Sequence, residues 1–331
     1  MKSIQQLRGA VVGLGSIGNR HLQNLSRLGL SDLTVVRRSG ATNPQFEVPE
    51  HISTQTSLDA ALSDSIDFVL ICNPSHCHVE TAIRCLEADV SVLIEKPLAR
   101  EQSSEISRLV ELASTTSAVC SMAYCMRYHP AYQQARRASN DGSIGRCLYA
   151  KAWFEGYLPA WHPWEDYRNS YAAKAEQGGG ALRTLDHELD YLNWVFGASE
   201  TAVGCAVNTG GIEIAADDFA SVTQCHSSGV VSTTTQALCR RPQSRGFEWV
   251  GTDGVLRYEN ETATLTLQSV DSEFAEDCQS FAAYDINQMY VDLLHDFLNV
   301  VAGQRASGSF ANLQSGIDTL KVIQAVDGAA T

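Results

Sequence analysis

Length, composition and charge limit the classes to which this chain can belong. Its 331 residues suggest two domains, and 44% hydrophobic with 19% charged residues is the balance of an ordinary globular protein rather than a disordered one. The formal charge of −14, from 24 Lys+Arg against 38 Asp+Glu, excludes general binding to nucleic acid and disfavours an anionic membrane surface.

The same survey sets expectations for location and metals. No apolar run approaches about 18 residues, so we expect no transmembrane helix. The N-terminus lacks the pattern of a signal peptide, and we expect a cytoplasmic protein. The ten cysteines are scattered and form no Cys-x-x-Cys pair, so we expect reduced thiols and no metal site.

The first 125 residues alternate short β-like and helix-like segments. The predicted strands are 10–14, 33–37, 68–72, 90–94 and 118–123, and the predicted helices are 21–28, 58–62, 79–87 and 103–113. This alternation predicts an α/β, Rossmann-like domain with a parallel sheet and helices on both faces.

The texture changes after residue 125. Helices are predicted at 130–138, 186–195, 289–301 and 316–326, and β-rich segments at 201–208, 219–225, 230–238, 246–251, 255–258 and 262–267. A stretch rich in Trp, Tyr and Pro covers 149–171. We therefore expect residues 126–331 to form an α+β domain with an open, mostly antiparallel or mixed sheet, whose C-terminal helix is free to pack back on domain 1–125.

A glycine motif follows the first predicted strand. Gly13, Gly15 and Gly18 form a G-x-G-x-x-G, with Ser16 and Ile17 between the last two glycines. The glycines allow a tight turn, the approach of a pyrophosphate and close helix packing, while the helix N-terminus attracts the anion. The motif predicts a dinucleotide site; the alternative is a turn that binds nothing.

The next strand ends in two arginines where this fold usually carries an acid. Arg37 and Arg38 stand in place of the Asp or Glu that holds an adenine ribose. Two guanidinium groups suit a 2′-phosphate, so the sequence favours NADP(H), with NAD(H) possible. The alternative is that one arginine stacks on adenine and the other is solvated.

Four motifs in order carry a family resemblance. They are the glycine loop, Asn73-Pro74 followed by His78, Glu95-Lys96-Pro97, and a segment with Arg127 that precedes a helix containing His187 and Asp190. The chain resembles the Gfo/Idh/MocA oxidoreductases, the relatives of glucose–fructose oxidoreductase and inositol dehydrogenase. Residues 156–197 are similar to a subgroup associated with surface polysaccharide and nonulosonic acid sugars.

The resemblance implies a catalytic pair. Lys96 matches the family lysine that polarises the substrate oxygen, and His187 matches its catalytic base. The alternatives are a surface lysine and a hydrogen-bonded core histidine. The resemblance also places Asn73, Pro74, His78, Glu95 and Arg127 near the cofactor, although His78 and Arg127 could instead be structural hydrogen-bonders.

The chain departs from the family at one catalytic position. The family usually has an aspartate three or four residues before the histidine, where this chain has Arg183 and Thr184. Asp186 is the nearest acid and could contact substrate or only complement the helix dipole. Thr184 could contact substrate or only cap the helix.

A substrate surface is expected in the aromatic stretch. Tyr157 and Trp161 offer flat faces to a sugar, and His162 and Arg168 offer hydrogen-bond donors. The alternative is that these side chains pack against their own sheet or a neighbouring subunit.

The resemblance implies hydride transfer between a nicotinamide and a sugar hydroxyl or ketone, in surface glycan biosynthesis. It also implies a homo-oligomer, dimer or tetramer, formed through the sheet of the second domain. Two alternatives are a cofactor-binding regulator or scaffold without turnover, and non-redox sugar chemistry assisted by NAD.

Overall fold

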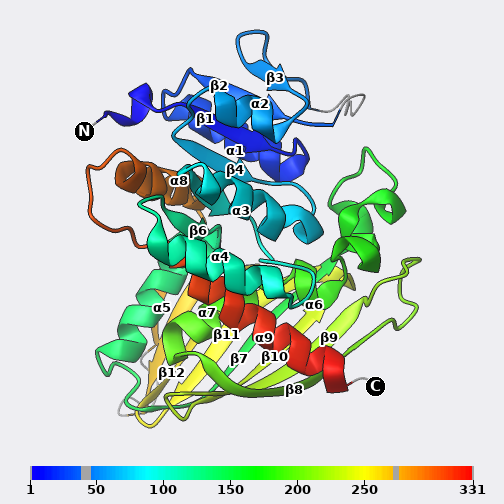
Figure 1. The fold of residues 1–331 in the computed structure, drawn as a ribbon. Helices are drawn as coiled ribbons and strands as arrows, with labels where there is room; N and C mark the ends of the chain where they lie inside the picture. Colours follow the sequence, from blue (N-terminus) through cyan, green and yellow to red (C-terminus); the bar gives the residue numbers. More distant parts are fainter. Residues whose placement is uncertain (1, 39–45, 271–275, 330–331) are drawn as a thin grey trace. The chain divides into compact units, whose positions relative to one another are not determined.

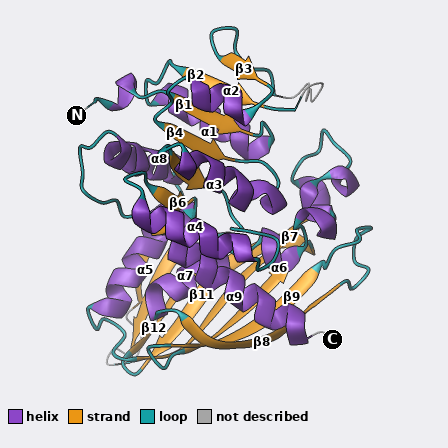
Figure 2. Cartoon of the chain, in the orientation of Figure 1, coloured by secondary structure: helices purple, strands orange, loops and turns teal. Residues whose placement is uncertain are grey.

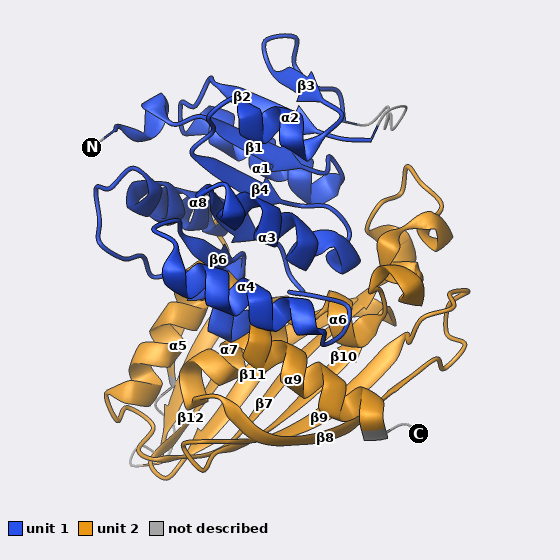
Figure 3. Cartoon of the chain, viewed as in Figure 1, with its two compact units in different colours: residues 1–125, 286–316 blue, residues 126–285, 317–331 orange. Residues whose placement is uncertain are grey.

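The computed structural model describes residues 2–38, 46–270 and 276–329. The chain divides into two compact units, Met1–Cys125 with Ile286–Gly316, and Met126–Asp285 with Ile317–Thr331 (Figure 3). Segment 286–316, which the sequence analysis assigned to the second domain, therefore belongs to the first unit. Within the described ranges, no helix has both the length and the apolar character needed to span a membrane.

The first unit contains a seven-stranded sheet (Figure 1). Its order is β15 (Ala311–Asn312), β6 (Cys120–Met122), β5 (Ser91–Ile94), β4 (Phe68–Ile71), β1 (Gly9–Val12), β2 (Leu33–Val36) and β3 (Ser53–Gln55). All neighbours are parallel except β15, which runs antiparallel to β6. The order 3-2-1-4-5-6 is that of a doubly wound dinucleotide-binding sheet, and its order reverses between β1 and β4.

Helices complete the first unit. They are α1 (Ser16–Arg27), α2 (Leu58–Ser63), α3 (His78–Glu87), α4 (Ser104–Thr115) and α8 (Gln288–Val301). The late helix α8 joins this unit through α1, because the amides of Asn24 and Asn287 exchange hydrogen bonds of 2.8 and 3.2 Å. The predicted Rossmann-like α/β domain is confirmed.

The second unit contains an eight-stranded sheet (Figure 2). Its order is β14 (Glu276–Ser280), β13 (Thr264–Ser269), β12 (Gly254–Glu259), β11 (Cys239–Gly251), β7 (Cys147–Tyr157), β10 (Val231–Ala237), β9 (Phe219–His226) and β8 (Ser199–Val207). Only β7 and β10 are parallel neighbours; every other pair is antiparallel. The predicted α+β domain with a mixed sheet is confirmed.

Helices cover one face of this sheet. They are α5 (Pro130–Asn140), α6 (Ala181–Thr184), α7 (His187–Phe196) and the later turns of α9 (Leu313–Ala329). Leu182, Leu189, Val222 and Ile323 belong to one apolar cluster, which joins α6, α7, β9 and α9. The other face carries exposed Val203 and Val231.

The strand β7 was missed by the sequence analysis, which described its residues only as part of an aromatic stretch. Its inward positions hold the small buried residues Ala150 and Ala152, whereas Lys151, Trp153 and Glu155 lie on the opposite, open face. Because the buried positions hold small residues and the aromatic Trp153 lies on the open face, the alternation of apolar and polar residues is weak in the sequence.

Candidate functional site

The glycine loop leads from β1 into α1, and each glycine meets a different constraint. Gly13 has φ +92°, and a Cβ there would lie 2.7 Å from the Cys72 carbonyl oxygen. A Cβ on Gly18 would collide with the Gly13 carbonyl oxygen. By contrast, a Cβ on Gly15 would meet nothing within 4 Å, so the N-terminus of α1 is open on that side.

This loop fits a pyrophosphate. Gly15 caps α1 and is exposed, as is Ser16, while Ile17 is half-buried. The first amides of a helix have no intrahelical acceptor, and they favour an anion at this end. Ser16 and Ile17 therefore supply backbone donors where the open side of Gly15 admits a ligand.

The two arginines lie beyond β2. The Arg37 backbone N–H donates to the Gln55 carbonyl at 3.0 Å, and the residue is half-buried, whereas Arg38 is exposed. Burial raises the pKa of the Cys77 thiol, and the positive charge of Arg38 opposes that rise. Arg38 thus lies near the turn that follows β4.

The Asn73-Pro74 turn is held by His78. The imidazole is 2% exposed, with Nδ1 2.8 Å from the Pro97 carbonyl oxygen and Nε2 2.7 Å from that of Asn73. Burial is the main cause of a lowered His78 pKa. Both ring nitrogens therefore face backbone acceptors, which favours the structural alternative for His78 over direct cofactor binding.

The Glu95-Lys96 segment follows β5. Glu95 is buried, and its Oε1 lies 2.7 Å from Nε2 of His21, on α1. The other oxygen, Oε2, accepts the Lys96 backbone N–H at 3.2 Å. Lys96 itself is half-buried.

His21 was missed from the sequence. Its signal was a polar residue three positions after Gly18, on the buried side of α1. Both carboxylate oxygens of Glu95, a residue that the resemblance places near the cofactor, have partners within the protein.

In the second unit, Arg127 pairs with Asp190. Arg127 Nε lies 2.9 Å from Oδ2 and Nη2 2.6 Å from Oδ1, and both side chains are buried. Burial raises the pKa of Asp190, and the Arg127 charge opposes the rise. The guanidinium also lies 5.6 Å from the Trp194 ring centroid. These contacts favour the structural alternative for Arg127.

His187 is the first residue of α7. Thr184, the last residue of α6, and Asp186, at the cap of α7, are buried, whereas His187 is half-buried. The next residue, Glu188, is buried against Arg245 at 2.8 Å. Thr184, Asp186 and His187 therefore lie close together at the short connection between α6 and α7, as their spacing in the sequence requires.

The aromatic stretch mostly packs or pairs locally. Tyr157 and Trp161 pack against an apolar cluster that includes Leu158, and Trp161 also stacks on Phe154 with ring centroids 6.0 Å apart. For these two side chains the packing alternative is met.

The two polar members of the stretch have acidic partners close in the structure. Nδ1 of His162 lies 2.9 Å from Glu165, and Arg168 binds Asp166 at 2.9 Å and Glu213 at 2.7 Å. Arg168 and Glu213 are exposed, so this pair is open to exchange with a ligand carboxylate or phosphate.

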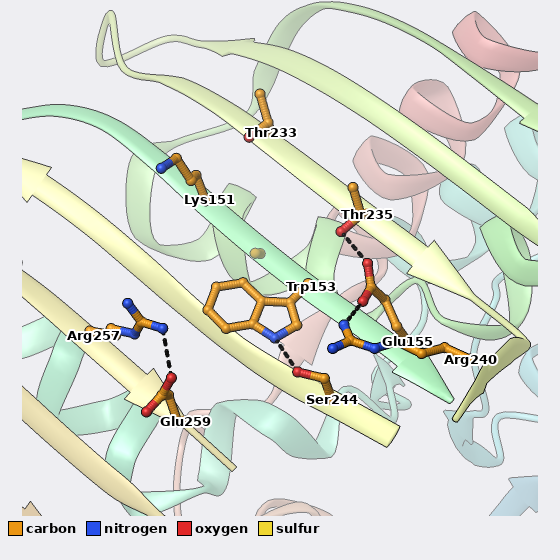
Figure 4. Close-up of a pocket in the computed structure, with 10 residues that line it drawn as sticks. Lys151, Trp153, Glu155, Thr233, Thr235, Arg240, Ser244, Arg257 and Glu259 are labelled. Carbon is orange, nitrogen blue, oxygen red and sulfur yellow. Dashed lines mark hydrogen bonds and ion pairs between the residues drawn. The ribbon is translucent and has the colours of Figure 1, made fainter. Parts of the chain in front are cut away.

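A hollow of about 490 Å³ lies on the open face of the second sheet (Figure 4). Its charges are internally matched: Glu155 accepts from Thr235 at 3.0 Å and pairs with Arg240, and Arg257 pairs with Glu259. None of the predicted site residues lines it. Across the described ranges, no cluster of His, Cys, Asp and Glu has the arrangement of a metal site.

Two family models match consecutive parts of the chain. The model described as "Oxidoreductase family, NAD-binding Rossmann fold" matches residues 7–124, and the "GFO/IDH/MocA C-terminal domain" matches residues 132–257. The chain belongs to the Gfo/Idh/MocA family. The glycine loop and Lys96 fall within the first match, and Arg183 to His187 within the second.

Part of the chain is similar to a named dehydrogenase. The chain is 27% identical over 210 residues to scyllo-inositol 2-dehydrogenase (NAD(+)) of Bacillus subtilis (strain 168), a match covering 60% of this chain and 56% of that enzyme. The chain therefore spans just over half the length of this Gfo/Idh/MocA relative.

Two solved structures share the fold over almost the full chain. Levoglucosan dehydrogenase in complex with NADH superposes with a TM-score of 0.84 at 18% identity, covering 98% of this chain and 96% of that one. The WlbA dehydrogenase from Bordetella pertussis, in complex with NADH and UDP-GlcNAcA, gives 0.80 at 17% identity, covering 100% and 97%. At these identities the likeness shows the Gfo/Idh/MocA fold.

Proposed function

We propose that this protein is an NAD(P)-dependent oxidoreductase that acts on a CH–OH group of a sugar or sugar derivative. The observation that carries the proposal lies in the first sheet. The strands β1, β4 and β5 are parallel neighbours, so the glycine loop, the Asn73 turn and Lys96 emerge at the same edge. That edge is where doubly wound sheets bind ligands.

The reaction requires two transfers from the substrate. A bound nicotinamide supplies the C4 position that accepts or returns a hydride. Lys96 polarises the substrate oxygen. His187 accepts the hydroxyl proton while the C–H bond breaks and its hydrogen leaves as hydride. In reduction, His187 returns that proton to the oxygen.

Asp186 and Thr184 are the proposed substrate neighbours of His187. The family aspartate is absent at the Arg183 and Thr184 positions, and Asp186 is the buried acid adjacent to the base. We propose that the Asp186 carboxylate, on the residue before the base, stabilises the positive charge that develops when His187 accepts a proton.

The finer cofactor preference is NADP(H), because Arg37 and Arg38 replace the usual acid after β2. The solved relatives described above hold NADH, so a preference for NADP(H) would set this chain apart from them.

The proposed pathway is surface glycan synthesis, with a nucleotide-linked or acidic sugar as substrate. Support comes from the likeness of residues 156–197 to that subgroup and from the UDP-sugar bound by WlbA. The exposed Arg168 suits a sugar carboxylate or phosphate.

We also propose a homo-oligomer formed through the open face of the second sheet. Exposed Val203 and Val207 lie on the edge strand β8, and exposed Val231 lies on β10. Burial of these valines against a second copy would remove apolar surface from water and so favour association.

The test uses Lys96→Ala and His187→Ala with both cofactors and a panel of nucleotide-linked and acidic sugars. We expect both variants to fold and bind NAD(P)H, shown by fluorescence titration, and to lose most turnover. Normal rates in both would overturn the proposed active site. Cofactor binding without any hydride exchange would indicate a scaffold. A cofactor that copurifies, with no net change in nicotinamide absorbance per turnover, would indicate non-redox chemistry.

A further inference from the structure

Two buried histidines flank the proposed catalytic lysine. His21 contacts the side chain of the residue before Lys96, and His78 contacts the carbonyl of the residue after it. Both histidines belong to helices that follow predicted cofactor-binding turns, α1 and α3. The segment Glu95-Lys96-Pro97 therefore contacts α1 on one side of the lysine and α3 on the other.

The His21 contact differs from that of His78 because it involves a second ionisable group. His21 and Glu95 are both buried, at 1% and 7% exposure, and their atoms are 2.7 Å apart. A buried carboxylate needs such a partner, because an unpaired charge in the interior is costly. The second oxygen of Glu95 accepts the Lys96 backbone N–H. His21 therefore fixes the rotamer of Glu95, and Glu95 fixes the start of the lysine turn.

Other groups surround this pair. The charge of Glu95 acts on Cys72, His78 and Tyr290, and the Tyr290 ring lies edge-on to His21 with centroids 6.1 Å apart. The Arg20 guanidinium lies over the face of that ring, 4.6 Å from its centroid. His21 is the group within hydrogen-bond distance of Oε1, so its loss leaves the carboxylate to find another donor.

We propose that His21 is a positioning residue for Lys96, acting through Glu95. It lies six residues into α1, whose N-terminus forms the proposed phosphate site, and so it connects that site to the lysine turn. Without His21, the Glu95 carboxylate loses its partner at Oε1. Lys96 is the next residue in the chain, and we expect the carboxylate to turn toward its ammonium. The lysine is then more strongly protonated and less reactive. The catalytic role of Lys96 rests on the proposed function. The coupling between Lys96 and His21 does not depend on that function.

The test measures Lys96 directly, in the protein without cofactor. Competitive labelling with acetic anhydride across pH 7–11, read by mass spectrometry, gives the reactivity of each lysine. The chain has only five lysines, so Lys174 and Lys321 serve as internal references. The variants are His21→Leu, His21→Gln, which retains an N–H donor, and His51→Leu, an exposed histidine of the same unit.

We expect His21→Leu to slow Lys96 labelling at pH 8 by about threefold or more, equivalent to a pKa rise of about half a unit. His21→Gln and His51→Leu should stay near the wild-type rate, and the reference lysines should not change. An unchanged or faster Lys96 in His21→Leu would overturn the proposal.

Two further measurements make the result decisive. If His21→Leu fails to fold, Glu95→Gln removes the carboxylate charge itself at nearly constant shape. Lys96 labelling should then rise, because the nearby negative charge is gone, and no change would overturn the proposal. In the complete enzyme, His21→Leu should shift the pH profile of kcat, and His21→Gln should restore it. If Lys96 responds but no NAD(P)H binds, the proposed function fails and the positioning role stands.

Discussion

The guanidinium of Arg127 holds both carboxylate oxygens of Asp190, at 2.9 and 2.6 Å. Asp190 is the fourth residue of α7, the helix that begins at His187. The pair therefore fixes the helix carrying the proposed base to the segment that precedes α5.

Removing one member of this pair should destabilise the second unit. Arg127→Met leaves a buried carboxylate without its partner, and we expect a loss of about 3–5 kcal/mol in the free energy of unfolding. All five tryptophans lie between residues 153 and 249, so urea unfolding followed by tryptophan emission reports on this unit.

A double variant measures the interaction energy between Arg127 and Asp190 apart from the effect of each residue alone. Arg127→Met with Asp190→Leu replaces both charges by apolar groups, and we expect it to recover much of the loss. If the two single effects simply add, within about 0.5 kcal/mol, the pair is not coupled and the interpretation is wrong.

His129 predicts how this unit responds to acid. Its Nδ1 accepts the Ala131 backbone N–H at 3.2 Å and so caps α5, and burial lowers its pKa to about 4. The folded state binds fewer protons than the unfolded state between pH 6.5 and 4, so stability is full above that window and falls as the pH drops through it. We expect a loss of about 2 kcal/mol between pH 7.5 and 5 from this residue.

The matched variant is His129→Asn, which keeps a capping oxygen but does not titrate. Urea midpoints at pH 7.5 and 5 should differ less in this variant than in the wild type. His226 also has a pKa lowered by burial, so a smaller pH dependence should persist. Equal pH dependence in both proteins would assign the acid sensitivity to other groups.

The sequence predicted the local elements better than the long-range partners. Apolar runs and the glycine motif locate β1, β2, β4 and β5, because buried parallel strands are nearly continuous apolar segments. β7 was missed because its buried positions Ala150 and Ala152 are small while the aromatic Trp153 lies on the open face. α8 and β15 follow the second sheet in sequence yet belong to the first unit. No local sequence pattern shows that the chain returns to that unit.

The candidate site divides in the same way. Gly13, Gly15 and Gly18 were assigned by local backbone constraints, and the space around each agrees with its role. Glu95 and Arg127 were assigned by resemblance, whereas their buried partners His21 and Asp190 lie 74 and 63 residues away. Such pairings depend on tertiary packing, which spacing along the chain does not reveal.

Two alanine substitutions in the glycine loop should have different effects, one on cofactor affinity and the other on thermal stability. Gly15→Ala adds a methyl group to open space, so Tm should change little, but the methyl occupies the path of a phosphate. We expect the Kd for NAD(P)H to rise at least about tenfold, a loss of about 1.4 kcal/mol in binding. Gly18→Ala drives a Cβ into the Gly13 carbonyl, so Tm should fall markedly.

Differential scanning fluorimetry and fluorescence titration distinguish the two variants. Gly29→Ala is the control for left-handed backbone away from the loop, since Gly29 has φ +87° and lies beyond the end of α1. It should lower Tm without a specific effect on the Kd. Tight cofactor binding in Gly15→Ala would show that the open side of the loop is not the phosphate path.

We expect the choice between NADP(H) and NAD(H) to depend on the two arginines after β2. Arg38 is exposed, and a 2′-phosphate paired with it would gain charge-assisted hydrogen bonds that NAD(H) lacks. Arg38→Ala should therefore raise the KM for NADPH about tenfold or more, corresponding to about 1.4 kcal/mol, and change that for NADH by less than about twofold.

Arg37→Ala, tested in parallel, shows whether the half-buried neighbour shares the role. Arg8, which pairs with Asp32 at 2.9 Å in the same unit, gives the control variant Arg8→Ala. A wild-type kcat/KM that favours NADH, or equal effects of Arg38→Ala on both cofactors, would contradict the prediction and leave Arg38 to stack on adenine or to face solvent.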